Sequence, residues 1–574
     1  MILAVVLTAL LLFGWDAGMR YFYPQANKPK PVAAASNAPA PEATASAKPT
    51  REGGLTNAAD QALEAKDLQT ALNPAGRIPI AAPGLSGSLN LTGGVVDDLT
   101  LNHHTAAIAK DSGPQRIFSP AGTPAQQYAQ FGFLGAAGVN APNAGTVWTA
   151  PQGAKLTPQT PVTLTWNNGA GQTYSLTYAI DDAYMITVRQ AVANGGAAPV
   201  SVKPFALVNR TDKTASVDTW NVHSGPFGAF DGTVSFAPNY KDVLKDGQVA
   251  NAGKTDWVGF TDIYWMSTLI PDAAGATSDF RSLGGNVYRA DMVYGDATVA
   301  PGAELVRTTR LFAGAKESNV LDKYEASGIP HFGLAIDWGW FRWFEKPIFW
   351  LLKSLFSFAG NFGVAIILLT LIVRGVMFPI AQRQFASMAA MRAIQPKMKA
   401  IQERYKDDRA KQQEEVMKLY KQEGVNPLAG CLPIFLQIPV FFALYKVLIL
   451  AVEMRHQPFV LWIKDLSAPD PLHILNLFGL LNFTPPAFLG IGVLALLLGT
   501  TMYFQFKLNP AQMDPVQQQM FSIMPWMMMF IMAPFAAGLL IYWITSNVLT
   551  IAQQKYLYSR HPQLKAQAEK DATD

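Results

Sequence analysis

The shortage of charged residues across most of 347–557 constrains this chain more than any other feature of its sequence. Only 15% of the 574 residues are charged, against roughly 25% in ordinary soluble domains. A helix needs about 20 apolar residues to cross a bilayer, and three segments meet that length: Asn361–Ile380, Leu432–Val452 and Ala487–Phe506. Residues 82–330, by contrast, have the composition of a soluble protein. We therefore expect a polytopic α-helical membrane protein that carries a soluble domain.

The last apolar block, Phe521–Ile551, is too long for a single crossing. As one helix its 31 residues would measure ~46 Å at 1.5 Å per residue, whereas the hydrocarbon core is ~30 Å thick. Pro534 and Gly538 lie close together inside the block, and both residue types favour a break in a helix. This block is therefore predicted to form two short helices joined by a tight turn.

The first 23 residues resemble a membrane anchor more than a cleaved signal peptide. An apolar run is followed by Trp15 and by the aromatic stretch 21–23, which is typical of a membrane–water interface. No small-residue cleavage site follows. Beyond the anchor the sequence becomes rich in Pro, Ala and Ser without an apolar period, so residues 24–81 are predicted to be a flexible linker.

The distribution of basic residues predicts the topology. Arg383–Glu423 holds ten Lys and Arg against six Asp and Glu, and the tail after Ile551 carries four more Lys and Arg. The positive-inside rule places both regions in the cytoplasm, which requires the last block to cross twice. The chain then has six spans and both termini in the cytoplasm, although Arg20, Lys28 and Lys30 beyond the anchor point the other way.

This topology divides the chain into eight parts. They are an anchor (1–23), a linker (24–81), an extracytoplasmic domain (82–330), an interfacial amphipathic helix (331–360), the second span (361–382), a cytoplasmic helical hairpin (383–427), the third to sixth spans (428–557) and a basic cytoplasmic tail (558–574).

The extracytoplasmic domain has the pattern of an all-β sandwich. Val162–Trp166, Thr173–Ile180 and Ala183–Val192 alternate apolar with polar residues and are separated by short turn sequences. Many short strands of this kind are typical of two packed antiparallel sheets. The domain contains no metal-ligand spacing and no G-x-S-x-G motif, so it is interpreted as a binding or scaffolding domain, without a metal or a catalytic residue.

Asp337–Asn361 is predicted to be an amphipathic helix in the membrane interface. Its charged residues, among them Arg342, Lys346 and Lys353, recur at helical spacing, while aromatic residues occupy the other side. The alternative is a soluble helix packed on the β domain, which is less favoured because a membrane span follows directly.

The cytoplasmic segment is predicted to form two antiparallel helices. The first carries Met388, Met391, Met398 and Ile401, and the second carries Leu419 and Tyr420 among its apolar residues. Either the hairpin only connects two spans, or its methionines form an adaptable surface for varied apolar partners. The sequence does not separate these two interpretations.

Arg374 is the most informative single residue, because it lies inside the span Asn361–Ile380. An arginine at the centre of a membrane helix costs roughly 2.5–3.5 kcal/mol on insertion scales. Spans two to six contain no Asp or Glu to pair with it. One alternative is that Arg374 snorkels to the cytoplasmic headgroups, as Lys446 could do on the other side. The other is a water-filled, positively charged cavity, for which neighbouring spans supply further polar groups: Thr370, Gln437, Thr500, Thr501, Tyr542, Ser546 and Asn547.

These segments together resemble the YidC/Oxa/Alb family of membrane protein insertases, in the form found in Gram-negative bacteria. The resemblance covers essentially the whole chain and rests on "LLTLIVRGVMFPI", the basic hairpin, "NPLAGCLPIFLQIPVFFALYKVL", "DPVQQQMFSIMPWM" and "FAAGLLIYWITSNVLTIAQQKYL". It implies a five-helix insertase core around a hydrophilic groove. Arg374 and Thr370 match groove residues of the family, and Gln437 and Phe441 match its Q-x-P-x-F motif. Trp543 follows Tyr542 where relatives often have a second tyrosine, which keeps the aromatic wall and removes a hydroxyl.

The resemblance implies a function and a set of partners. The chain is expected to insert nascent membrane proteins into the bacterial inner membrane and to help them fold, alone or with the Sec translocon. The ribosome is expected to bind the hairpin and the basic tail, and lipids to surround the core. A net charge of +4 is too small to indicate DNA binding, and neither an enzyme nor a cofactor is predicted. The alternative is a secondary transporter or channel, but that class needs repeated halves and intramembrane acids.

Overall fold

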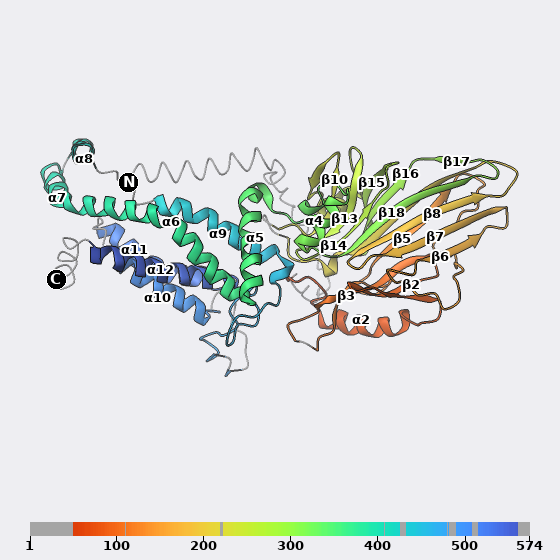
Figure 1. The fold of residues 1–574 in the computed structure, drawn as a ribbon, viewed down its shortest axis with the longest axis horizontal. Helices are drawn as coiled ribbons and strands as arrows, with labels where there is room; N and C mark the ends of the chain where they lie inside the picture. The colour runs from red at the N-terminus through yellow and green to blue at the C-terminus, as the bar shows by residue number, and fades with distance from the viewer. Residues whose placement is uncertain are drawn as a thin grey trace, which may run out of the picture.

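The computed structural model describes residues 50–109, 111–218, 222–406, 408–424, 432–478, 480–481, 490–507 and 515–560. Strands gather at one end of the elongated molecule and long helices at the other (Figure 1). The predicted anchor and the tail beyond residue 560 lie outside the described residues.

Two antiparallel sheets form the β domain. The ten-stranded sheet has the order β1 (Arg77–Ala81), β2 (Leu85–Asn90), β3 (Val95–Thr105), β5 (Gln127–Gly135), β9 (Val200–Thr211), β16 (Val287–Tyr294), β15 (Ala276–Gly284) and β12 (Gln248–Ala250), with β4 (Pro114–Phe118) beside β3 and β17 (Ala297–Val299) beside β9. The eight-stranded sheet has the order β11 (Thr233–Ser235), β10 (Gly225–Phe230), β13 (Thr255–Thr261), β14 (Trp265–Ile270), β18 (Glu304–Ala315), β8 (Met185–Asn194), β7 (Gln172–Ile180) and β6 (Val162–Asn167). The predicted sandwich and its three named strands are therefore confirmed.

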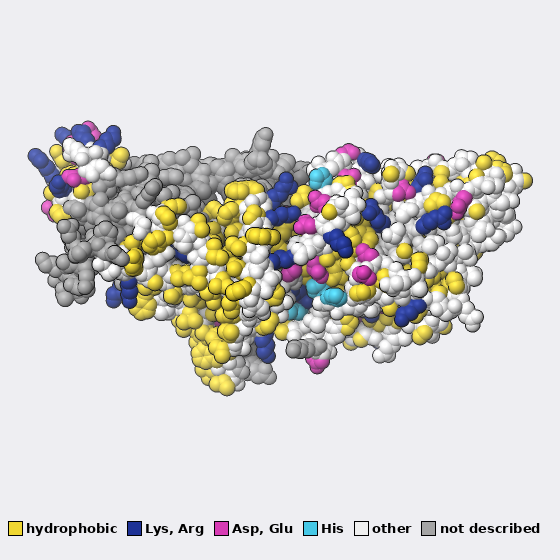
Figure 2. Space-filling view, viewed as in Figure 1, with side chains coloured by type: hydrophobic (Ala, Val, Ile, Leu, Met, Phe, Trp, Pro, Cys, Tyr) yellow, Lys and Arg dark blue, Asp and Glu magenta, His cyan; other side chains and the backbone are white. Residues whose placement is uncertain are grey.

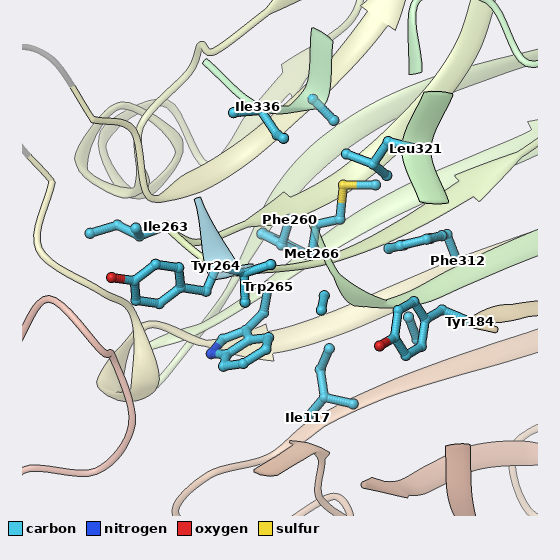
Figure 3. Packing of buried hydrophobic residues seen from close by; sticks show 14 of the residues in the cluster. Ile117, Tyr184, Phe260, Ile263, Tyr264, Trp265, Met266, Phe312, Leu321 and Ile336 are labelled. Atoms are coloured by element: carbon cyan, nitrogen blue, oxygen red, sulfur yellow. The ribbon is translucent and has the colours of Figure 1, made fainter. Parts of the chain in front are cut away.

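The core of the β domain lies between the sheets. Strand β7 buries every second residue, and two of these, Tyr174 and Tyr178, meet Phe133 and Phe131 of β5 with ring centroids 5.1 and 6.1 Å apart. A pleated strand sends alternate side chains to opposite faces, so the period-two sequence pattern places these rings inside. The same buried cluster includes Tyr184, Phe312 and Leu321 near Trp265 (Figure 3).

The prediction of a flexible linker is wrong for residues 58–71 and 77–81, which form a helix and a strand. Ala58–Ala71 forms the helix α2, capped by the Asn57 side chain, and Arg77–Ala81 forms strand β1. Helix α2 is held to the domain because the buried carboxylate of Glu64 accepts a hydrogen bond of 2.8 Å from the Ala125 backbone N–H. The sequence pattern missed this helix because its contacts are polar and it has no apolar face.

Two short helices, α3 (Tyr240–Asp246) and α4 (Ser318–Ala326), belong to the β domain, and longer helices follow it. The helices are α5 (Arg342–Ala359), α6 (Phe362–Ala393), α7 (Gln395–Arg404), α8 (Arg409–Gln422), α9 (Leu432–Leu450), α10 (Val493–Lys507), α11 (Pro515–Met532) and α12 (Ala537–Arg560). The predicted break in the last block is confirmed, because α11 ends at Met532 and α12 begins at Ala537.

Among the described residues, one helical segment, Phe362–Gln382, is both long and apolar enough to cross a membrane by itself. Shorter apolar helical segments cover Gln437–Leu450, Val493–Lys507 and Ser522–Met532. Helix α6 continues without a break past residue 382 to Ala393, so its last part occupies the start of the predicted hairpin.

Helix α5 lies across the direction of α6 and α9 (Figure 1). Its Trp343, Trp350 and Phe358 side chains are 67%, 70% and 86% exposed, as expected for an interfacial helix. Its charged side, however, contacts protein: Lys353 donates to Asn319 at 2.7 Å and Lys346 lies 3.7 Å from Asp322, both on α4. The charged side therefore packs on the β domain, and the placement of the aromatic side in the membrane interface stays a prediction.

Candidate functional site

The site is built around Arg374, in the middle of α6. Its Nε donates a hydrogen bond of 3.0 Å to Oγ of Ser546 on α12, and its Nη2 donates to the same oxygen. Ser546 is only 1% exposed, whereas Arg374 is half-buried. Helices α6 and α9–α12 contain no Asp or Glu in their sequences, so a neutral hydroxyl, not a carboxylate, holds this cation.

A second contact continues the polar row from α12 to α9. Tyr542 lies one turn before Ser546, and residues four apart share a helix face. The Gln437 side chain on α9 donates a hydrogen bond to the Tyr542 hydroxyl oxygen, which is buried inside the bundle. The structure therefore brings together three predicted site residues, Arg374, Gln437 and Tyr542, with Ser546 between the first and the last.

Helix α10 is connected to the same region by a separate hydrogen bond. Asn547 Nδ2 donates to Thr501 Oγ1 at 3.2 Å, and Asn547 is 3% exposed. Two of the polar groups predicted on different spans thus meet each other. The arrangement gives the inner faces of α6, α9, α10 and α12 a set of hydrogen-bonding side chains where an all-apolar bundle would have none.

Thr370 was expected to line the groove, but its side chain is bonded within its own helix. It is 1% exposed, and its hydroxyl donates to the Ile366 carbonyl oxygen of its own helix at 2.7 Å. That back-bond satisfies the hydroxyl hydrogen locally. In the part of the chain that the structure describes, no hydrogen bond joins Thr370 to Arg374, although Thr370 lies one turn before it.

Aromatic residues form a wall beside the polar row. Phe441 on α9 meets Trp543 on α12 edge to face, with ring centroids 5.3 Å apart, and it stacks on Tyr445 at 6.5 Å. Tyr445 in turn lies 5.8 Å from Phe535 in the turn before α12. Because Tyr542 and Trp543 are neighbours on one helix, the first contributes to the polar row and the second to the wall.

The predicted methionine surface of the hairpin is not open at Met398. Its sulfur accepts a hydrogen bond of 3.2 Å from the Tyr420 hydroxyl, and the side chain packs beside the buried pair Ile394 and Leu419. Met398 therefore belongs to the small core between α7 and α8. Met388 lies on α6, as does Met391, and their side chains are outside what the structure describes.

A cluster that the sequence did not reveal joins the β domain to the helices. The Arg455 side chain, 3% exposed, pairs with Glu52 and donates to the Thr105 carbonyl oxygen at 2.8 Å. Its guanidinium also lies 5.2 Å from the ring centre of Trp265. Residues so far apart in the chain leave no local signal, so only the folded structure could show this contact.

Two further groups at this junction have altered pKa values. Burial raises the pKa of Glu345 to about 7, an effect that nearby Lys446 opposes and Asp337 reinforces. Burial also lowers the pKa of Lys316 to about 8, against the pull of Asp262 and Asp337. Lys446 was expected to snorkel, but its ammonium group donates to the Asp337 carbonyl oxygen at 2.8 Å.

One group at the junction could in principle hold a cation. Ligand atoms of Glu52, His456 and Asp465 lie within 4.8 Å of one another. The Glu52 carboxylate is already engaged by Arg455, and Asp465 accepts hydrogen bonds from Ser467. These carboxylates have protein partners, and we assign no metal to them.

The fold and site define an integral membrane protein with a large extracytoplasmic β domain and a polar row inside its helical bundle. The family described as 60Kd inner membrane protein matches residues 354–565, and the YidC periplasmic domain matches residues 77–351. The chain belongs to the YidC family of membrane protein insertases. The family match extends the periplasmic domain beyond the predicted 82–330 at both ends.

Close relatives cover nearly the whole chain. The membrane protein insertase YidC of Zymomonas mobilis subsp. mobilis is 43% identical over 566 residues, covering 98% of this chain and 95% of the relative. That of Rhizobium etli is 42% identical over 571 residues, covering 97% and 95%. A crystal structure of an active YidC insertase is 21% identical and covers 83% of this chain and 92% of that one, with a TM-score of 0.36.

Proposed function

We propose that this chain inserts membrane proteins into the bacterial inner membrane through a groove lined by the polar row. The observation that carries the proposal is Arg374, a half-buried cation that is bonded to Ser546, while the sequences of α6 and α9–α12 contain no acidic residue. A cation without a carboxylate partner remains able to attract an anion from outside. A guanidinium also has five donors, which suits two-point binding of a carboxylate.

The groove lowers the barrier for a polar tail that must cross the membrane. Charged groups are expensive in hydrocarbon, so a polar path partway across shortens the distance over which the tail lacks water. Arg374 attracts an acidic residue of the tail into that path. Release toward the periplasm then requires only that the remaining distance be crossed, with hydrophobic transfer and the membrane potential supplying the driving force.

The apolar part of the substrate leaves along the aromatic wall of Phe441 and Trp543. On the lipid-facing side, α11 exposes large apolar residues, among them Trp526 and Met527, at 43% and 49%. A substrate helix that slides over such a surface exchanges one apolar contact for another. Little energy is lost at any point of this path, because lipid tails and these side chains are equally apolar.

The proposed topology has six spans, with both termini in the cytoplasm and the β domain in the periplasm. Helices α6 and α9–α12 would form a five-helix core, and residues 1–23 would supply the first span. The basic excess in 383–423 supports the cytoplasmic placement of α7 and α8.

The proposed partners follow from three surfaces. Nascent membrane proteins would bind the groove, and the ribosome would bind the basic hairpin and tail. Lipids would cover the exposed aromatic side of α5 and the apolar helices, which Figure 2 shows as a broad hydrophobic surface. Cooperation with the Sec translocon, and action without a cofactor or a catalytic step, follow from the family and remain proposals.

The proposal is tested with purified chain in proteoliposomes and a single-span substrate that has either an acidic or a neutral tail. We expect Arg374→Ala to slow insertion of the acidic-tailed substrate by about tenfold or more, the scale of a hydrogen bond to a charged group. The neutral-tailed substrate should lose much less, and Arg374→Lys should retain part of the preference. Equal rates for both substrates in the Arg374→Ala variant would show that attraction of charge is not the mechanism.

A further inference from the structure

The loop between α9 and α10 ends in a compact turn that exposes five large apolar side chains. Leu475, Leu477, Phe478, Leu480 and Leu481 are 48%, 53%, 51%, 84% and 45% exposed. We call residues 472–478 with 480–481 the apolar tip. In Figure 2 it lies within the hydrophobic surface that projects from the side of the helical bundle. A group of exposed apolar residues of this kind marks an interaction site.

The backbone of the apolar tip is bonded to itself. The Phe478 N–H donates to the His473 carbonyl oxygen at 2.9 Å, and the Leu481 N–H donates to the Asn476 carbonyl oxygen at 3.0 Å. Leu477 and Phe478 have φ values of 49° and 59°, a left-handed conformation that large side chains rarely adopt. The turn therefore accepts backbone strain in order to close these hydrogen bonds while its side chains point outward.

Internal bonding of this kind suits a loop at the membrane interface. Water becomes scarce toward the hydrocarbon, so backbone groups there must be satisfied within the protein, and irregular backbone exposed to lipid stays outside the hydrocarbon core. The sequence agrees, because residues 471–506 contain no Asp, Glu, Lys or Arg. A loop in the aqueous periplasm would have no reason to combine exposed Leu and Phe side chains with a complete lack of charge.

The tip is fixed to the start of α10. It is attached directly to the first turn of that helix, because the Ile474 N–H donates to the Ile491 carbonyl oxygen at 3.0 Å and the Val493 N–H donates to the Leu472 carbonyl oxygen at 3.2 Å. The tip therefore lies at the level of the first turn of α10.

From this placement we propose that the apolar tip lies at the headgroup–acyl boundary of the periplasmic leaflet and inserts its Leu and Phe side chains among the phospholipid acyl chains. It fixes that end of α10 in the bilayer. Its lipid-facing surface continues that of α10, where Leu496 and Leu497 are 38% and 42% exposed. The inference rests on the proposed membrane placement of the bundle, so its experiment contains a separate check of that placement.

The experiment uses the full chain with Cys431→Ser, which removes the single native cysteine. One new cysteine, Leu480→Cys, is labelled with an environment-sensitive fluorophore, and the protein is reconstituted in phosphatidylcholine vesicles. Two quenchers are compared: a nitroxide on the lipid acyl chain and iodide in the buffer. We expect the lipid nitroxide to quench the probe strongly and iodide to have little effect.

Two control positions make the result decisive. Val376→Cys on α6, where Val376 is 74% exposed, reports the membrane placement, and Thr298→Cys on β17 reports the aqueous periplasmic domain. If position 376 is quenched by lipid while position 480 responds to iodide, the tip lies in water and the inference is wrong. If position 480 resists both quenchers, protein covers the tip and the inference is also wrong. If position 376 escapes the lipid nitroxide, the proposed membrane placement itself fails.

A second labelling site protects the test against a local folding defect. Leu475→Cys lies in the same tip and should give the same pattern of quenching as Leu480→Cys. Disagreement between these two sites would contradict a tip that enters the leaflet as one unit.

Discussion

Two arginines in this molecule are held in opposite ways. In the β domain, Arg210 is 2% exposed and pairs with the carboxylate of Asp262, which also accepts a hydrogen bond of 2.9 Å from the Ser216 backbone N–H. In the helical bundle, Arg374 is bonded to the Ser546 hydroxyl, and no acid is present in the five apolar helices. The first cation is neutralised by its surroundings, whereas the second keeps its charge available.

The difference separates an arginine that serves the fold from one that serves a ligand. A buried ion pair stabilises the structure only as a pair, and removal of one partner leaves a costly charge. A cation with only a hydroxyl beside it contributes little to stability but attracts an incoming anion. The following predictions test this contrast, beginning with the largest expected effect.

Asp262→Ala should destabilise the β domain by about 3–5 kcal/mol, because it leaves Arg210 buried without its carboxylate. Thermal unfolding of the full chain in detergent measures the change. Glu304→Ala is the matched control, since Glu304 pairs with Arg189 at an exposed site and should cost less than about 1 kcal/mol. Similar losses for both variants would remove the distinction between the two kinds of pair.

The junction should weaken as the pH rises, because the pKa of Glu345 is raised to about 7 in the folded chain. A carboxyl with a raised pKa binds its proton more tightly when folded, so stability falls between about pH 4.5 and 7 and stays low above. The Glu345→Gln variant should lack this loss, which amounts to up to about 3 kcal/mol in the free energy of unfolding. The measurement is the melting temperature at pH 5.5 and 8, and an unchanged difference would contradict the assignment.

Ser546→Ala should have a smaller effect, through the orientation of the Arg374 guanidinium. The substitution removes the acceptor of both hydrogen bonds that Arg374 donates. We expect the lost orientation to be worth about 1 kcal/mol, so insertion of an acidic-tailed substrate should slow by about fivefold. Ser546→Thr keeps a hydroxyl and should restore most of the rate. If the alanine variant slows acidic and neutral substrates equally, Ser546 has only a structural role.

Much of the fold could be predicted because its signals are local. Strand β7 alternates along its length, and the break near Pro534 follows from a block too long for one helix. The parts that were missed depend on contacts between distant residues. Helix α2 is held by Glu64 and the Ala125 backbone and has no apolar pattern of its own. The helical pattern of α5 was visible, but the contact of its charged side with α4 was not.

The candidate site was predictable to a similar degree. Arg374, Gln437 and Tyr542 were expected near one another, and the structure brings them together through Ser546. The bond of Thr370 to its own helix was not predictable, because a motif gives the spacing of a side chain but not its rotamer. Met398 likewise turned inward to Tyr420, a partner on the other helix of the hairpin.

The central claim is that the charge of Arg374 recognises the tail of the substrate. It is tested most directly by charge reversal, with Arg374→Glu assayed in proteoliposomes against substrates with acidic and basic tails of equal length. The account predicts that the native chain favours the acidic tail and that the variant reverses the preference. If the order of the two substrates stays the same in both proteins, the charge at position 374 does not select the tail and the account is wrong.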